Sequence, residues 1–135
     1  MPLLLVLEDN PVDLRKAVDI GKRAGFNEVE VYGYASEAKA YLGKALSGDV
    51  PVPAGMIVDL DLGIESGFEL MRFWHSTPRL KAIPLIVWTV MGEHQREICR
   101  LFGATHFISK DDDINILKDA LAKISGITGS QSRTA

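Results

Sequence analysis

The sequence is poor in several features, and each shortage excludes a class of protein. Cys99 is the only cysteine among 135 residues, so a disulfide framework and a thiolate metal cluster are both excluded, and a reducing compartment is expected. The formal net charge of −3 gives no general attraction to nucleic acid or to membranes. The apolar run at the N-terminus, Leu3 to Leu7, has only five residues, too few for a signal peptide or a membrane span. We therefore expect a cytoplasmic protein that inserts into no membrane and binds no nucleic acid directly.

What the sequence does have is an alternation of short apolar runs with amphipathic segments, which predicts an α/β protein with a parallel sheet and right-handed crossovers. The expected strands are Leu3–Leu7, Val29–Tyr32, Met56–Leu60, Leu85–Thr89 and Thr105–Ser109. The first, third and fourth runs are almost continuously apolar, as in strands that are covered on both faces, whereas Val29–Tyr32 alternates and suits an edge strand.

Helix signals fill the intervals between these strands. The expected helices run from the cap Asn10 with Pro11 to Gly25, from the cap Ser36, from the capping box Ser66–Glu69, and over Gly92–Phe102 and Asp112–Ile124. The last residues, 126–135, are small and polar. We expect them to form a flexible tail after one folded domain over residues 1–125.

Chemically reactive side chains stand where the expected strands end. Glu8 and Asp9 follow the first strand, Asp59 ends the third, Thr89 ends the fourth and Lys110 follows the fifth. Ligands of parallel α/β sheets bind at the carboxyl ends of the strands, so we expect these side chains to meet at one edge. No glycine-rich loop follows the first strand, which argues against a P-loop or dinucleotide site. Acids, a hydroxyl and an ammonium would instead make a small metal and phosphoryl site.

With these residues in place, the sequence resembles the receiver domain of two-component response regulators, over residues 3 to about 125. The matching features, in chain order, are the acidic pair Glu8-Asp9, Asp59 with Gly67 eight residues later, Thr89, and Lys110 with the aromatic Phe107 three residues before it. The resemblance implies a flavodoxin-like fold, which is a doubly wound five-stranded parallel sheet of strand order 2-1-3-4-5 with helices on both faces.

The resemblance also implies a magnesium-dependent phosphoryl acceptor. Asp59 would attack phosphorus and form an aspartyl phosphate. A divalent cation would relieve the repulsion between the clustered carboxylates and neutralise the phosphoryl oxygens, and oxygen-only ligands suit Mg²⁺. Asp9 and Asp59 are the expected direct ligands, Glu8 is expected to act through water, and Asp61 would contribute its backbone carbonyl, as in the family.

Two further residues at strand ends are expected to bind the phosphoryl group. Lys110 would pair with one phosphoryl oxygen, and Thr89 would donate a hydrogen bond to another. In the family's switch, Thr89 would then move inward and Phe107 would follow it. For Phe107, a half-buried strand aromatic is an equally good interpretation.

Four positions depart from the family's pattern. Gly63 stands where proline is common after the acceptor aspartate, a mild change in a loop. Val90 follows Thr89 where alanine or glycine is usual, and we expect its bulk to crowd the site. Asp61 places a second carboxylate beside the acceptor. Asp111 follows Lys110 where the family usually has proline after a cis peptide bond. A cis bond before a non-proline residue costs about 3 kcal/mol, so the conformation of that bond stays open.

The function implied is that of a stand-alone response regulator. Such a phosphoprotein takes its phosphoryl group from a histidine kinase or a histidine phosphotransfer protein and signals through contacts with a downstream protein. It would be a monomer or a weak dimer. It would catalyse only its own phosphorylation and dephosphorylation, and is therefore not an enzyme in the ordinary sense.

Two alternatives stay open. The segment Asp59-Leu60-Asp61 also resembles the D-x-D motif of haloacid dehalogenase-type phosphohydrolases, in which Asp61 would be the general acid–base. Against this alternative, that motif usually opens the fold, whereas two strand–helix units precede it here. The other alternative is a degenerate receiver that acts only as a binding module, and the complete set of strand-end residues argues against it.

Overall fold

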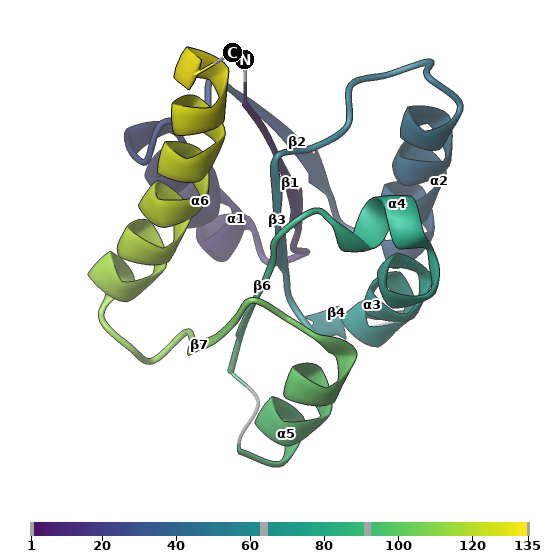
Figure 1. Ribbon diagram of the computed structural model, residues 1–135. Helices are drawn as coiled ribbons and strands as arrows, with labels where there is room; N and C mark the ends of the chain where they lie inside the picture. Colours follow the sequence, from purple (N-terminus) through teal and green to yellow (C-terminus); the bar gives the residue numbers. More distant parts are fainter. Residues whose placement is uncertain (1, 63–64, 91–92, 135) are drawn as a thin grey trace.

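The chain is built around a five-stranded parallel sheet, as shown by a computed structural model that describes residues 2–62, 65–90 and 93–134 (Figure 1). The strands are β1 (Leu3–Leu7), β2 (Glu28–Tyr32), β3 (Gly55–Val58), β6 (Leu85–Thr89) and β7 (His106–Ser109). Their order across the sheet is β2-β1-β3-β6-β7, and every neighbouring pair is parallel. Counted along the chain, this is the predicted order 2-1-3-4-5. The doubly wound fold class is therefore confirmed, with β2 at an edge as its alternating sequence indicated.

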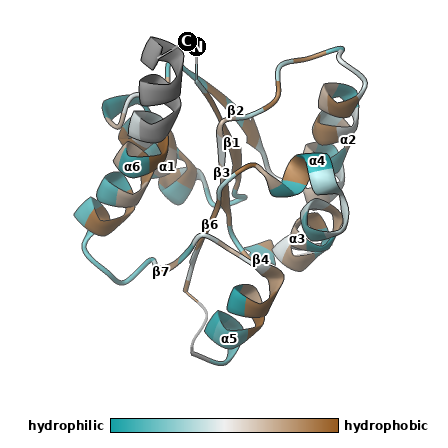
Figure 2. Cartoon of the chain, viewed as in Figure 1, coloured by the Kyte–Doolittle hydropathy of each residue, from teal (hydrophilic) through white to brown (hydrophobic). Residues whose placement is uncertain are grey.

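Helices cover both faces of the sheet. They are α1 (Pro11–Arg23), α2 (Ala35–Leu46), α3 (Gly67–Ser76), α4 (Pro78–Lys81), α5 (Glu93–Phe102) and α6 (Ile114–Thr134). Successive strand side chains point to opposite faces, so β1 places Leu3, Leu5 and Leu7 in a core with α2 to α5, and Leu4 and Val6 in a second core with α1 and α6. Figures 1 and 2 show the two layers, with the apolar stripes of the helices turned toward the sheet.

Local signals explain where several helices begin and end. The Asn10 side chain caps α1, since its oxygen accepts hydrogen bonds from the N–H groups of Val12 and Asp13 at 3.0 and 3.1 Å. Gly25 ends that helix with a φ of 114°, a conformation that favours glycine. The Ser66 hydroxyl accepts from the N–H of Phe68 at the start of α3. The predicted caps Asn10 and Ser66 are thus confirmed.

The predicted cap Ser36 is wrong. Tyr34 occupies the cap position of α2, without a capping side chain, and Ser36 lies inside the helix. Ala35 and Ala38 are both fully buried, so the packing of these alanines against the sheet, rather than a hydroxyl cap, determines where the helix starts. Gly92, the expected first residue of the helix now seen as α5, lies outside the described residues.

Some elements differ from the sequence-based expectation. β3 ends at Val58, and the chain then forms a small antiparallel pair, β4 (Asp61–Leu62) with β5 (Glu65–Ser66). α4 lies between α3 and β6, where no element was predicted. α6 continues to Thr134, past the expected end at Ile124, while the flexible tail over residues 126–135 stays a prediction. Among the described residues no helix is long and apolar enough to cross a membrane.

Candidate functional site

Backbone hydrogen bonds carry the strand ladders one step beyond the strands and so fix the residues that follow. The bonds run from Glu8 N–H to the Tyr32 carbonyl (2.9 Å), from Asp59 N–H to the Leu7 carbonyl (3.0 Å), and from Lys110 N–H to the Thr89 carbonyl (2.8 Å). The candidate residues of four strands therefore meet at one sheet edge, as predicted. The Lys110–Asp111 peptide bond, whose conformation the sequence did not decide, is trans.

Lys110 lies at the centre of this site. Its Nζ atom is 2.7 Å from Oε1 of Glu8, 2.9 Å from Oδ2 of Asp13 and 3.0 Å from Oδ2 of Asp59. The Trp88 ring also lies beside it, with its centroid 5.3 Å from Nζ. Burial alone would lower the pKa of Lys110, but the neighbouring carboxylates hold that pKa above its ordinary value of 10.5. The side chain is therefore an ammonium at every physiological pH.

Asp59 is nearly buried, and both of its carboxylate oxygens are engaged. Oδ2 accepts from Lys110, and Oδ1 accepts from the N–H of Asp61 at 3.3 Å. Gly67 packs directly on the backbone of Asp59, because a β-carbon at Gly67 would collide with the Asp59 carbonyl oxygen. This contact gives a physical reason for a glycine eight residues after the acid.

Three carboxylates form a candidate metal-binding group. Glu8, Asp9 and Asp59 each offer an oxygen, and these oxygens lie within 4.8 Å of one another. Glu8 is buried, and burial raises its pKa from 4.5 to about 7 against the opposing effect of the neighbouring Lys110 ammonium. Asp9 is exposed at the rim, where a bound ion could keep water ligands. The all-oxygen donor set and this open side fit Mg²⁺. The Asp61 side chain is exposed and is not part of the group.

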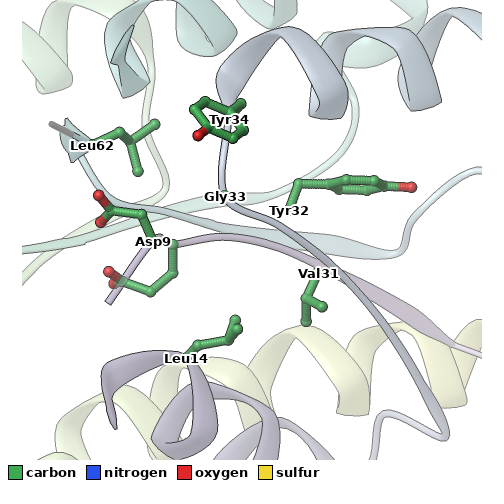
Figure 3. A pocket seen from close by; sticks show the side chains of 8 residues that line it. Asp9, Leu14, Val31, Tyr32, Gly33, Tyr34 and Leu62 are labelled. Carbon is green, nitrogen blue, oxygen red and sulfur yellow. The ribbon is translucent and has the colours of Figure 1, made fainter. Parts of the chain in front are cut away.

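Two hollows adjoin these acids. A cleft of about 340 Å³ is lined by Asp9, Asn10, Asp13, Asp59, Asp61, Val90 and Lys110. Figure 3 shows the other, a cavity of about 390 Å³ with the Asp9 carboxylate at one end and Leu14, Val31, Tyr34 and Leu62 around it. The cleft reaches Asp59 and Lys110 together, so a small solute can approach both side chains from solvent.

The two expected switch residues lie on adjacent strands. Thr89 is fully buried at the end of β6. Phe107 is half-buried on β7, and the Arg96 guanidinium of α5 stacks 4.8 Å from the centre of its ring. Phe107 is thus a half-buried strand aromatic packed against α5, and its role as a switch residue stays a prediction.

Sequence reasoning missed the part that Asp13 plays in this site. Asp13 was not among the predicted site residues, yet its carboxylate accepts a hydrogen bond from Lys110 at 2.9 Å, as that of Asp59 does at 3.0 Å. Its position, four residues after Asp9 and in the first turn of α1, was the available signal. This position predicts a contact with Lys110 only when the rotation of α1 about its axis is known, because that rotation decides where the Asp13 side chain points.

Comparisons with solved structures place the fold among the response regulators. The Mn²⁺-bound response regulator Rcp1 is 21% identical with a TM-score of 0.76, covering 92% of this chain and 91% of its own. The phosphorylated cyanobacterial phytochrome response regulator RcpA is 24% identical with a TM-score of 0.75, covering 91% and 90%. The chemotaxis response regulator CheY4 of Vibrio cholerae is 22% identical with a TM-score of 0.76, covering 92% and 98%.

No protein-family model and no curated protein sequence matches the chain. The likeness to these three structures is thus one of fold, since their sequences are only 21–24% identical to that of this chain. The chain has the fold of the response-regulator receiver domains.

Proposed function

We propose that the chain is a response-regulator receiver domain whose Asp59 accepts a phosphoryl group. One observation carries this proposal: a buried carboxylate contacted by a lysine ammonium at 3.0 Å stands beside two further acids, at the bottom of an open cleft. Ion pairs that serve stability alone do not need an entrance from solvent. An acceptor of a small charged group does.

The chain's own residues account for the transfer. An Asp59 oxygen attacks phosphorus as the bond from phosphorus to the donor breaks, and the donor leaves with that electron pair. Lys110 is positioned to pair with a phosphoryl oxygen, and its fixed charge opposes the repulsion between the carboxylate and the incoming anion. Thr89 would donate a hydrogen bond from its hydroxyl group to another phosphoryl oxygen. With a histidine kinase or histidine phosphotransfer protein as donor, the leaving group is an imidazole.

Mg²⁺ would be held by Asp9 and Asp59, with Glu8 acting through water and Asp61 through its backbone carbonyl. When bound, the ion neutralises charge on the phosphoryl oxygens and among the acids. The support comes from the donor set, in which three carboxylate oxygens lie within 4.8 Å, and from Rcp1, a fold neighbour whose structure holds Mn²⁺. RcpA is a fold neighbour in phosphorylated form, and it likewise supports the proposal that this chain accepts a phosphoryl group.

Output is proposed to pass through protein contacts of a cytoplasmic monomer or weak dimer. Thr89 and Phe107 would connect the phosphoryl group to the surface made by α5, β7 and α6. The protein is then a signalling phosphoacceptor, and its chemistry is limited to gaining and losing its own phosphoryl group.

Incubation with Mg²⁺ and acetyl phosphate tests the proposal. Mass spectrometry of the intact protein and of its peptides should show one added phosphoryl group on Asp59. Asp59→Asn should abolish it, whereas the matched change Asp61→Asn, two residues away, should leave labelling in place. Labelling of Asp59→Asn at the wild-type rate would put the nucleophile elsewhere.

The same reaction separates the alternatives. A phosphohydrolase using Asp59 and Asp61 would turn over a small phosphomonoester many times per protein molecule, and would lose that turnover in Asp61→Asn. A degenerate receiver would show neither labelling nor turnover. One stable phosphoryl group per chain is the result expected for the proposed function.

A further inference from the structure

The contact between Asp13 and Lys110 has no part in the transfer described above. An acid in the first turn of a helix ordinarily needs no further explanation, because it complements the helix dipole. Here, however, Oδ2 of Asp13 accepts a hydrogen bond of 2.9 Å from a residue 97 positions later in the chain. The contact ties the start of α1 to the end of β7, which the dipole does not require.

The ammonium of Lys110 is enclosed by three carboxylates. Two of its three N–H donors bond Oδ2 of Asp13 and Oδ2 of Asp59 at 2.9 and 3.0 Å, and Oε1 of Glu8 lies 2.7 Å from Nζ as an ion pair. The Trp88 ring covers part of the remainder, and the lysine side chain is only 9% exposed. A phosphoryl oxygen can therefore pair with Lys110 only by displacing one of the three carboxylates.

Asp13 is the carboxylate that is released at least cost. Its side chain is 22% exposed, against 1% for Glu8 and 5% for Asp59, so water can replace its lost partner more fully. Glu8 is also bound by the N–H of Asn10 at 3.1 Å. Asp59 is the group that would carry the phosphoryl, and it cannot leave. Asp13 moreover lines the cleft through which a phosphoryl compound enters.

We propose that Asp13 is a positioning residue of the phosphoryl site, holding in the unphosphorylated protein the place on Lys110 that a phosphoryl oxygen takes. The inference rests on the proposed function, because it needs a phosphoryl group at Asp59. Two consequences follow from the geometry. Asp13 opposes phosphoryl binding, through competition for Lys110 and through like-charge repulsion in the same cleft. Phosphorylation also breaks the contact between the first turn of α1 and the end of β7, so the environment of α1 changes with the phosphorylation of Asp59.

Beryllofluoride, a mimic of the phosphoryl group, measures this competition by titration at saturating Mg²⁺ with Trp88 fluorescence as the signal. Asp13→Asn should bind it about tenfold more tightly than the wild type, as expected for removing one unit charge a few ångströms away at a partly exposed site. Binding of Mg²⁺ alone should become weaker, since a nearby negative charge is lost. A general structural defect would instead weaken both.

The matched control is Asp19→Asn, which makes the same change on the same helix. Asp19 pairs with the exposed Arg23 at 3.1 Å, and this variant should bind beryllofluoride as the wild type does. Asp13→Glu, which keeps the carboxylate, should return the affinity toward the wild-type value. In magnesium-free protein, the ammonium protons of Lys110 should exchange with water faster in Asp13→Asn, as measured by NMR.

Equal or weaker beryllofluoride binding by Asp13→Asn would overturn the inference, as would the same tightening in Asp19→Asn. Either result, with a wild type that is labelled at Asp59, leaves the proposed function standing. A wild type that neither binds beryllofluoride nor is labelled by acetyl phosphate would overturn both.

Discussion

Val90 stands at the rim of the cleft above Asp59, with 58% of its surface exposed. In the proposed transfer, a water or a phosphodonor that enters by this cleft passes Val90, so the extra bulk relative to alanine should slow both steps. We expect Val90→Ala to accelerate labelling by acetyl phosphate and loss of the phosphoryl group, each about fivefold, which is ~1 kcal/mol of barrier. Mass spectrometry of samples quenched at successive times measures both rates.

Val52→Ala is the control for this prediction, since Val52 is similarly exposed at 51% and does not line the cleft. Equal rates in the wild type and Val90→Ala would show that Val90 does not gate the site. A wild-type phosphoryl lifetime of seconds would also count against crowding, and attention would shift to Asp61.

Glu8 gives a prediction about pH at the same scale. Burial raises its pKa in the folded protein from 4.5 to about 7, so the folded state binds more protons than the unfolded state between these values. The contribution of Glu8 to the free energy of unfolding is therefore complete below pH 4.5 and is lost as the pH rises to about 7. Denaturant unfolding in the presence of a chelator should show this decline in the wild type and a flatter profile in Glu8→Gln. Parallel profiles would mean that Glu8 titrates normally.

At the scale of elements, Gly67 lets the first residue of α3 pack against Asp59, the residue after β3. A β-carbon at this position would collide with the Asp59 carbonyl, and backbone gives way less easily than a side chain. Gly67→Ala should lower the free energy of unfolding by about 1–3 kcal/mol, as overpacking does, and should slow labelling because Asp59 shifts. Chemical denaturation and acetyl phosphate labelling measure the two effects.

Gly43 provides the comparison, because an added β-carbon there meets nothing within 4 Å. Gly43→Ala in the middle of α2 should be neutral or stabilise the protein by up to about 1 kcal/mol. Equal free energies of unfolding for the two variants would show that the close approach at Gly67 does not affect stability.

The elements also show which parts of the site can be read from the sequence. Glu8, Asp59, Thr89 and Lys110 were predictable because apolar runs mark the strands, and parallel strands align their ends at one edge. Asp13 was not predictable in its contact with Lys110, since that contact depends on how α1 is rotated against the sheet.

Short or context-dependent elements escaped the sequence for similar reasons. β4 and β5 are two residues each and α4 is four, too short for any periodicity to develop. Ser36 was chosen as a cap from its side chain, but the burial of Ala35 decided the start of α2. Local preference lost to tertiary packing in that case.

At the scale of the whole molecule, the site and the proposed output surface lie on connected strands. Thr89 ends β6, and β6 pairs with β7, which carries Phe107. The Arg96 guanidinium of α5 stacks on that ring and also donates to the Phe107 carbonyl at 3.5 Å. A movement of Thr89 toward the phosphoryl group would therefore displace β7 and α5 most, and β2 at the far edge of the sheet least.

Amide chemical shifts before and after phosphorylation test this order. The largest changes outside the Asp59 loop should lie within residues 93–124, across α5, β7 and the first part of α6, whereas β2 and α2 should change little. Asp59→Asn treated with the same donor should show none of these changes. Shifts confined to the Asp59 loop would contradict the switch, leaving a protein that carries a phosphoryl group without changing its surface. Arg96 of α5 stacks on the Phe107 ring. Chemical shift changes that reach Phe107 but not α5 would therefore mean that this stacked pair keeps α5 from moving.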